Sequence, residues 1–404
     1  MIRRRSLLGG ATALALAPAA PSIARAEQTP GITDKEIKFG NTYPYSGPAS
    51  AYSAGGKTET AYFRMINEQG GINGRKLNFI SYDDAYSPPK TVEQTRRLIE
   101  EDRVAFLFNP LGTPTNTAIY KYVNQKKVPQ LFIASGADKW ADYQEHPWTI
   151  CWGMSYRIEA RVYAKYILKN YPDVKIGILS QNDDYGKDYV LGMQDILGSR
   201  FSQVVRTTYE TTDATVDSQL VSLKEAGVGL ILTAAIPKFS AMIIRRMFDL
   251  DWKATHFITN PGASVGAVMQ PAGPERAIGA ISSTYLKDPT DPAWKDDADM
   301  IAWRAFMKKY NPDGDTDDGA NVYAYGAADS LCWVLKACGN DLSRENIMRQ
   351  ALNMHGVHCP SLLPGMTINT SPTNYRPIRQ LQLMRWTGKT WERFGELIEG
   401  AALT

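Results

Sequence analysis

The sequence predicts an α/β fold in which two doubly wound lobes, joined by a hinge, enclose a central cleft. Apolar runs of strand length alternate with amphipathic segments of helix length, which is typical of parallel sheets covered by helices. This alternation stops near residue 150 and then begins again. The chain has 404 residues, too many for one hydrophobic core and suitable for two lobes of ordinary size.

In the first half, each expected strand is a short apolar run that ends in turn residues. The expected strands cover residues 37–42, 77–82, 104–108 and 130–134. Helices are expected at about 54–68, at 89–102 and from Thr113 onward. Gly70-Gly71 ends the first of these helices. Thr113-Pro114 begins the third, with a hydroxyl at the N-cap and proline at the first helical position.

The second half repeats the pattern after residue 152. Strands are expected at 174–180, 204–209, 228–234 and 256–259, and helices at 156–170, 187–199, 216–226 and 239–250. A return strand at 280–285, helices at about 298–310, 319–338 and 343–353, and a hairpin of 380–386 with 389–394 follow. A chain that passes between lobes more than once builds a hinge above a cleft. The expected lobes are 27–150 with 283–375, and 151–282 with 376–404.

Residues 1–26 have the pattern of an export signal. Basic Arg3-Arg4-Arg5 precedes a weakly apolar stretch from Leu7 to Ala17, and Ala24-Arg25-Ala26 fits an A-x-A cleavage site. The arginine pair before Ser6 resembles a twin-arginine signal, and a general secretory peptide is the alternative. We therefore expect a periplasmic mature chain that begins near Glu27, just after Ala26.

The rest of the chain is nearly neutral, with 41 basic and 42 acidic residues, which gives no reason to expect nucleic acid as a partner. It contains no run of about 18 apolar residues, so we expect no membrane-spanning helix. The four cysteines lack CxxC spacing and the four histidines form no ligand cluster, so we expect no metal and no cofactor. Spacing leaves open whether Cys332 or Cys338 pairs with Cys359.

Two loops after neighbouring strands form the first candidate binding site. They are Asn109 to Gly112 and Ser135 to Asp138, and both should lie at the carboxyl edge of a parallel sheet. The helix that follows the first loop offers free N–H groups and the Thr113 and Thr115 hydroxyls, which suit a carboxylate. An ordinary helix cap without a ligand is the simpler interpretation.

Three groups of residues resemble a known family. They are Phe39-Gly40 with Pro44 to Pro48, the run Ile66 to Arg75 followed by Asp83-Asp84, and Asn182 to Gly186. Together they resemble the periplasmic leucine/isoleucine/valine-binding proteins, the solute receptors of branched-chain amino acid ABC importers. The resemblance covers about residues 30–395. It implies the type I periplasmic binding protein fold, with two lobes, three crossovers and a ligand in the cleft.

The resemblance also implies a function and a set of site residues. It implies a monomeric binding protein without catalytic activity, whose partners are membrane permease and ATPase subunits and whose ligand is an amino acid or organic carboxylate. The loop Leu111 to Thr115 would hold the ligand carboxylate, and Tyr185 would close over the ligand from the other lobe. The remaining implied cleft residues are Tyr43, Tyr45, Ala137, Asp138, Trp152 and Gly262, with Tyr156 and Trp140 as further wall residues.

The sequence departs from the leucine binders at the position of an acid that holds the ligand ammonium. Here the loop reads Asn260-Pro261-Gly262-Ala263-Ser264 and has no acid. Asp138 offers a charge, but it would lie near the ligand carboxylate and repel it. A branched-chain or other hydrophobic amino acid is therefore the first hypothesis. An aromatic or aliphatic carboxylate or an amide stays open, as does a sensor subunit of a signalling system with the same clamp.

Two short motifs compete with this interpretation. Gly262 to Gly266 matches the G-x-S-x-G of serine hydrolases, with His355 or His358 as the base and Asp288 or Asp291 as the acid. Two features count against a serine hydrolase: the sequence has no HGGG-type oxyanion loop, and Pro261 lies at the turn. Four acids, Asp313, Asp315, Asp317 and Asp318, resemble a calcium loop. Its glycine comes one place late and Ala324 replaces the final glutamate, so a helix cap at Asp318 is favoured.

Overall fold

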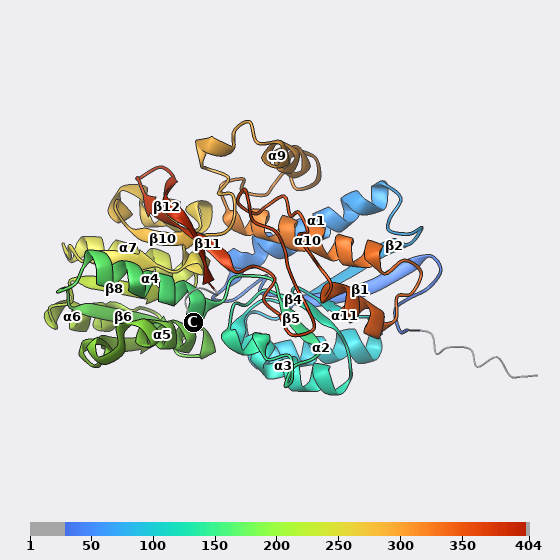
Figure 1. Ribbon diagram of the computed structural model, residues 1–404, viewed down its shortest axis with the longest axis horizontal. Helices are drawn as coiled ribbons and strands as arrows, with labels where there is room; N and C mark the ends of the chain where they lie inside the picture. The colour runs from blue at the N-terminus through green and yellow to red at the C-terminus, as the bar shows by residue number, and fades with distance from the viewer. Residues whose placement is uncertain (1–28, 401–404) are drawn as a thin grey trace, which may run out of the picture.

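The computed structural model describes residues 29–400 and contains two sheets, each covered by helices (Figure 1). The first sheet is fully parallel in the order β2-β1-β3-β4-β5. Its strands are β1 (Glu36–Tyr43), β2 (Lys76–Asp83), β3 (Leu107–Phe108), β4 (Gln130–Ile133) and β5 (Thr149–Cys151). The predicted export signal lies outside the described residues.

The second sheet has the order β12-β11-β10-β9-β8-β6-β7. Its strands are β6 (Ile176–Gln181), β7 (Val205–Tyr209), β8 (Leu230–Ala234), β9 (Thr255–Ile258), β10 (Ile281–Thr284), β11 (Gln380–Trp386) and β12 (Trp391–Glu399). Five strands are parallel, and the hairpin β11–β12 adds an antiparallel edge. The predicted α/β class with two doubly wound sheets is therefore confirmed.

Helices cover both sheets, and the last three helices, α9 to α11, return to the side of the first sheet late in the chain. The helices are α1 (Ser53–Glu68), α2 (Pro88–Arg96), α3 (Thr113–Gln125), α4 (Tyr156–Asn170), α5 (Asp184–Leu197), α6 (Asp217–Glu225), α7 (Pro237–Asp249), α8 (Gln270–Ala272), α9 (Ala298–Tyr310), α10 (Gly319–Ala337) and α11 (Arg344–Ala351). Figure 1 shows α10 beside α1, on the side of the first sheet, and α4 to α7 around the second. The chain thus crosses between the sheets after β5, after β10 and before β11. The lobe boundaries drawn from sequence stay predictions, although β10 lies wholly in the second sheet.

Some elements differ in length from the predictions for local reasons. The strand expected from Val104 shortens to Leu107–Phe108, and the side chain of Arg344 donates to the carbonyls of Val104 (3.0 Å) and Ala105 (2.8 Å). The helix expected from residue 187 begins three residues earlier. The Asp183 carboxylate accepts the N–H of Tyr185 (2.9 Å) and so caps α5. Strand β5, which was not predicted, extends the first sheet.

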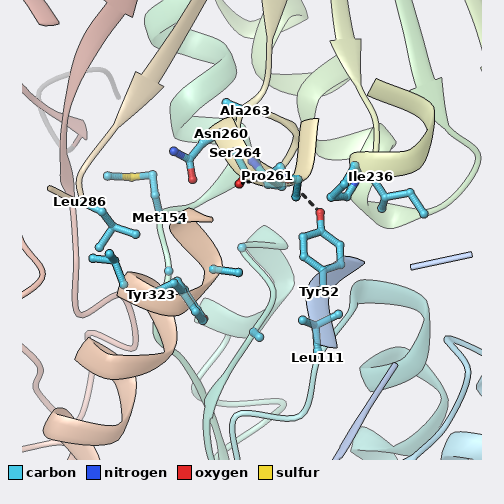
Figure 2. Close-up of a pocket in the computed structure, with 18 of the residues that line it drawn as sticks. Tyr52, Leu111, Met154, Ile236, Asn260, Pro261, Ala263, Ser264, Leu286 and Tyr323 are labelled. Carbon is cyan, nitrogen blue, oxygen red and sulfur yellow. Dashed lines mark hydrogen bonds between the residues drawn. The ribbon is translucent and has the colours of Figure 1, made fainter. Parts of the chain in front are cut away.

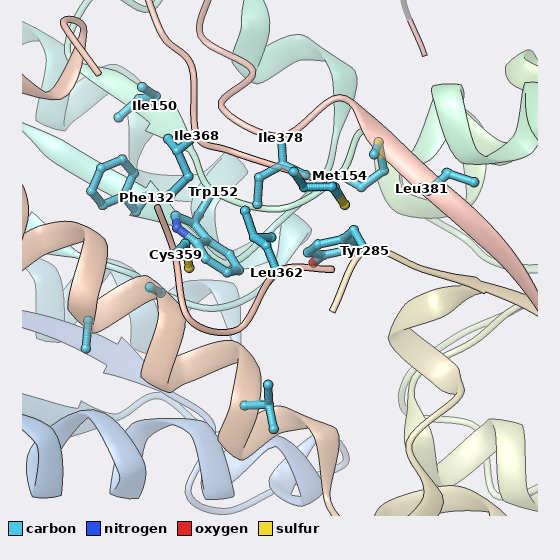
Figure 3. Packing of buried hydrophobic residues seen from close by; sticks show 14 of the residues in the cluster. Phe132, Ile150, Trp152, Met154, Tyr285, Cys359, Leu362, Ile368, Ile378 and Leu381 are labelled. Atoms are coloured by element: carbon cyan, nitrogen blue, oxygen red, sulfur yellow. The ribbon is translucent and has the colours of Figure 1, made fainter. Parts of the chain in front are cut away.

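One apolar core continues from the first sheet through the hinge into the second sheet (Figure 3). Trp152 is fully buried there, and its indole N–H donates to the Ser330 hydroxyl (2.9 Å). Trp152 therefore packs inside the hinge and is not a wall of the cleft as predicted. Two backbone bonds fasten the second crossover to the third. Lys287 donates to the Ser361 carbonyl (2.9 Å), and Leu363 donates to the Tyr285 carbonyl (3.1 Å).

The two lobes touch directly along both rims of the cleft. On one rim, the Tyr52 hydroxyl donates to the Pro261 carbonyl (2.9 Å), and Ser264 donates to the Asp318 carboxylate (2.8 Å). On the other, the backbone N–H of Asp138 donates to Asp188 (2.6 Å). Lys139 pairs with Asp184 (2.8 Å) on the same rim. The structure is therefore that of a closed clamp.

Asp188 titrates abnormally because closure covers it. Burial is the main cause that raises the pKa of its carboxyl to about 7, and the nearby acids Asp138 and Asp184 raise it further. The N–H of Asp138 and the Arg157 guanidinium act in the opposite direction. Asp184, by contrast, has a lowered pKa, because its bonds to Lys139 and Lys187 outweigh the opposing effect of burial.

Asp188→Asn should change how stability depends on pH. The folded-state pKa of Asp188 lies above its unfolded value, so its contribution to stability is complete at low pH and is lost as the pH rises toward 7. Relative to the variant, the free energy of unfolding of the wild type should fall by about 1–2 kcal/mol between about pH 5 and pH 8. Urea unfolding at the two pH values measures this difference.

Asp184→Asn is the matched control on the same rim. Its lowered pKa means that its contribution is present above the unfolded pKa and is lost only in acid. This variant should lose stability by a similar amount at both pH values. A difference between the wild type and Asp188→Asn that does not change with pH would contradict the assignment of the raised pKa.

Candidate functional site

A cavity of about 180 Å³ lies between the two sheets and is lined by residues of both (Figure 2). Backbone loops that follow β1, β3, β4 and β9, the starts of α3, α4, α5 and α10, and the crossover after β10 all reach it. The lining residues used below are Tyr43, Tyr52, Gly112, Thr113, Ser135, Gly136, Tyr156, Glu159, Tyr185, Asn260, Ser264, Tyr285, Lys287, Asp288, Asp318 and Tyr323. The edge of parallel strands is where open α/β sheets bind ligands.

The N-terminus of α3 is one end of this cavity. Its N-cap is Gly112, with φ of 107°, and within residues 29–400 no side chain caps the helix. A side chain at position 112 would collide with the Tyr86 ring, 2.5 Å from its Cβ, so only glycine fits. Thr113 was predicted as the N-cap but is the first helical residue. The N–H groups of Thr113 and Thr115 therefore have no side-chain cap, Pro114 between them has no N–H, and Gly112 and Thr113 line the cavity.

Three hydroxyl groups gather at this helix end. The Thr113 and Ser135 hydroxyls are 2.8 Å apart, and both side chains are buried. Tyr156 comes from the other lobe, and its backbone N–H donates to the Gly136 carbonyl (2.9 Å). Burial raises the pKa of the Tyr156 hydroxyl to about 12, while hydrogen bonding to Gly136, Thr113 and Ser135 opposes the rise. Neutral donors around a free helix N-terminus suit an anion such as a carboxylate.

Tyrosine rings form most of the remaining wall. Tyr185 is buried, its hydroxyl lies 2.9 Å from the Thr259 hydroxyl, and its ring packs edge-on against Tyr156 at 4.9 Å between centroids. Tyr43, Tyr285 and Tyr323 line the cavity from the first lobe and the hinge. These rings give a mostly apolar surface with a few hydroxyls, which suits an apolar ligand body.

The structure brings together only part of the predicted site. Of the predicted residues, Tyr43, Thr113 and Tyr185 line the cavity, as does Tyr156. Thr115 does not, because its hydroxyl donates to the Leu111 carbonyl (2.5 Å) inside the helix start.

Four other predicted residues have different surroundings. The Tyr45 hydroxyl bonds to Ser81 (2.6 Å). Ala137 and Trp140 pack in a small apolar cluster, from which the Trp140 indole donates to Ser135 (3.0 Å). At Gly262 an added Cβ would lie 2.4 Å from the Ser240 hydroxyl, so this glycine allows close backbone packing.

Asp138 is not a free charge in the cleft. Its carboxylate pairs with Arg376 (2.5 Å) and accepts a hydrogen bond from Ser155 (2.9 Å). The hypothesis that Asp138 compensates the acid missing after Pro261 is therefore wrong. Sequence reasoning could not foresee this pair, because Arg376 lies more than two hundred residues along the chain and belongs to the third crossover.

The charged groups that line the cavity are three acids and one lysine. Glu159 was missed by sequence reasoning. It accepts hydrogen bonds from four donors of the second lobe: Tyr163, Tyr189, Ser283 and the N–H of Asn260. Asp318 accepts from Ser264 and from the N–H of Ala320. The Lys287 ammonium forms ion pairs with the carboxylates of Asp297 and Asp299, each at 2.8 Å. Asp288 is the remaining acid.

The two competing motifs have structural explanations. Ser264 donates to Asp318 and caps the turn after it, while His355 and His358 are exposed and His358 contacts Asp299. Asp318 caps α10, as favoured above. Residues 29–400 contain no group of three or more acids, histidines or cysteines placed to hold a metal. All four cysteines are buried free thiols, so neither disulfide considered from spacing is formed.

Comparison with known proteins identifies the family. A periplasmic binding protein family model matches residues 36–390. The Leu/Ile/Val-binding protein homolog 1 of Brucella suis is 24% identical over 322 residues, which cover 77% of this chain and 81% of that protein. None of the helices in residues 29–400 is long and apolar enough to cross a membrane.

Solved structures share the fold at low sequence identity. A branched-chain amino acid ABC transporter protein from Thermus thermophilus with bound valine has a TM-score of 0.82 at 15% identity, covering 92% of this chain and 98% of its own. A fatty acid ABC transporter substrate-binding protein from Thermomonospora curvata has a TM-score of 0.78 at 21% identity, covering 92% and 95%. A solute-binding protein from R. palustris in complex with benzoate has a TM-score of 0.75 at 19% identity, covering 90% and 98%.

The fold, the cavity between two lobes and the sequence signature agree with these comparisons. The predicted resemblance to the leucine/isoleucine/valine-binding proteins is confirmed at the level of the family. Because the family model spans most of the chain, this protein belongs to the periplasmic binding protein family, of the type I kind that includes the Leu/Ile/Val-binding proteins.

Proposed function

We propose that this protein is the periplasmic substrate-binding component of an ABC importer and that it binds a branched-chain or other hydrophobic amino acid. The single observation that supports this most is the uncapped N-terminus of α3, with the Thr113, Ser135 and Tyr156 hydroxyls around it, at one end of a tyrosine-lined cavity. The other partners would be a membrane permease and its ATPase, docked to a monomer. The predicted export signal and the family support a periplasmic location.

Binding would follow from the arrangement of the two lobes. The ligand carboxylate lies at the α3 N-terminus in the first lobe, and the apolar part lies among Tyr43, Tyr185 and Tyr285. Tyr156 and Tyr185 come from the second lobe, so they reach the ligand only in the closed form. A ligand that contacts both lobes shifts the population toward this form, which a permease can recognise.

A second candidate is a ligand with a carboxylate or amide but no amino group. The solved relatives support keeping it, because one is described with benzoate and another as a fatty acid transporter protein. The loop from Asn260 to Ser264 also offers no acid for an ammonium. A sensor subunit with the same clamp is a further possibility for the same site. Neighbouring permease and ATPase genes would favour transport, and a neighbouring histidine kinase would favour sensing.

A thermal-shift screen tests the ligand class directly. The mature protein is heated with amino acids, aromatic acids, aliphatic acids and amides, and a bound ligand raises Tm by an amount set by its concentration relative to Kd. We expect hydrophobic amino acids to raise Tm. A shift with aromatic acids alone would favour the second candidate, and no shift with any carboxylate would contradict the proposed function.

Thr113→Val should weaken carboxylate binding without disturbing the fold. The change removes one donor at the α3 N-terminus and keeps the shape of the side chain, so we expect Kd to rise about tenfold. Isothermal titration with the ligand found in the screen measures this.

Thr115→Val is the matched control, two residues further along the same helix. Its buried hydroxyl bonds to the Leu111 carbonyl and does not line the cavity. The control should lose about 1 kcal/mol of stability with Kd unchanged. Equal effects of the two variants on Kd would mean that the Thr113 hydroxyl has no direct role in binding.

A further inference from the structure

We propose that Asp288 supplies the negative charge for an ammonium group of the ligand, so that the cavity selects a zwitterion over a simple carboxylate. This inference rests on the proposed function and names the ligand class more closely. The acid expected after Pro261 is absent, and Asp138 is already paired with Arg376. A different acid must therefore take this role if the ligand carries a positive charge.

Asp288 is held in the wall of the cavity by the second crossover. It follows β10 directly after Lys287, whose backbone N–H bonds to Ser361 (2.9 Å). The Asn260 side chain donates to the Ser283 carbonyl (2.8 Å), which ties the loop after β9 to β10. The loop that lacks the acid and the strand that precedes Asp288 are thus joined, and both line the same cavity.

The carboxylate of Asp288 has one oxygen in use and one available. Oδ1 accepts hydrogen bonds from the N–H of Thr290 (2.8 Å) and from its hydroxyl (2.6 Å). Among residues 29–400, no lysine, arginine or histidine forms an ion pair with Asp288, and no donor within them bonds to Oδ2. The charged groups that act on it, Asp291 and Asp317, are both acids. Burial, with these acids, raises the pKa of Asp288 to about 6, while the bonds from Thr290 oppose the rise.

The other charged groups near the cavity are already matched. Lys287 is bound by two aspartates, and Arg393 pairs with Asp291 (3.3 Å). Glu159 accepts hydrogen bonds from four donors within the protein. Asp318 accepts from Ser264 and Ala320 and caps α10, so the helix N-terminus stabilises its charge. Among residues 29–400, Asp288 pairs with no cation and, unlike Asp318, caps no helix. It is a partly buried carboxylate, which is unfavourable unless a partner arrives. An ammonium from the ligand is such a partner, and a second carboxylate is not.

The resulting cavity has two unlike polar regions. Neutral donors and the start of α3 attract a negative group, and Asp288 attracts a positive one. The tyrosines that line the same cavity accept an apolar body. A hydrophobic amino acid carries both charged groups, whereas a fatty or aromatic acid carries one.

Pairs of probes that differ only by an amino group test this inference. The pairs are leucine with 4-methylpentanoate, phenylalanine with 3-phenylpropanoate, and 6-aminohexanoate with hexanoate. Isothermal titration is done near pH 7.5 with the mature wild type and with Asp288→Asn, which keeps the acceptor for Thr290. We expect the amino member of at least one pair to bind more tightly to the wild type. In Asp288→Asn its affinity should fall about 30-fold or more, and that of its partner should stay the same or rise.

Asp291→Asn is the matched control, since this neighbouring acid does not line the cavity and is paired with Arg393. It should leave the preference for the amino member intact. Circular dichroism and Tm establish that both variants fold.

Three results would overturn the inference, and they can be told apart. Carboxylates that bind as tightly as their amino partners would end the role of Asp288 and leave the proposed function standing. If Asp288→Asn still binds the amino member of a pair more tightly than the simple carboxylate, Asp288 is not the partner of the ammonium, and the proposed function is unaffected. Failure of every probe to bind would remove the proposed function, and the inference with it.

Discussion

The uncapped start of helix α3 is the feature on which the site depends. Glycine at position 112 brings the chain into the helix without a side chain, so the first N–H groups remain available to a partner. Three hydroxyls surround this helix end, those of Thr113, Ser135 and Tyr156. The indole N–H of Trp140 donates a hydrogen bond to the Ser135 hydroxyl and holds it in place. The buried donors need an acceptor, and closure of the second lobe removes water as the alternative.

Closure itself is built from contacts that are spread along both rims. Tyr52 reaches Pro261, Ser264 reaches Asp318, and the η3 turn (Asp138–Ala141) reaches α5. The G-x-S-x-G segment and the acidic loop, which in the sequence resembled a catalytic and a calcium-binding motif, therefore contact each other across the cleft and hold it closed. Short glycine- and aspartate-rich turns serve this purpose because their backbones approach closely, as Gly266 does where its N–H donates to the Asp317 carbonyl (3.0 Å).

Sequence patterns predicted the elements well and the site only in part. Periodicity and end signals are local, so the strands and helices of both sheets, including α4 and α9, follow from nearby residues. The same local information placed Thr113 and Tyr185 at strand ends, where they line the cavity. It failed for Thr115, Trp152 and Asp138, whose partners Leu111, Ser330 and Arg376 depend on side-chain direction or on contacts far along the chain. Ser135 and Asn109 lie in the two loops that the sequence predicted as a candidate binding site. No local pattern predicted that Glu159 would line the cavity.

The sequence by itself determined the two doubly wound lobes, the repeated crossing between them and a helix that begins at Thr113 beside the cleft, because short-range periodicity and turn chemistry encode each of these features. The tertiary structure alone decided which charges are free. Arg376, on the third crossover, neutralises Asp138, whereas Asp288, on the second crossover, pairs with no cation among residues 29–400. Charge pairing depends on distances between residues that are remote in the chain, and no local pattern encodes those distances.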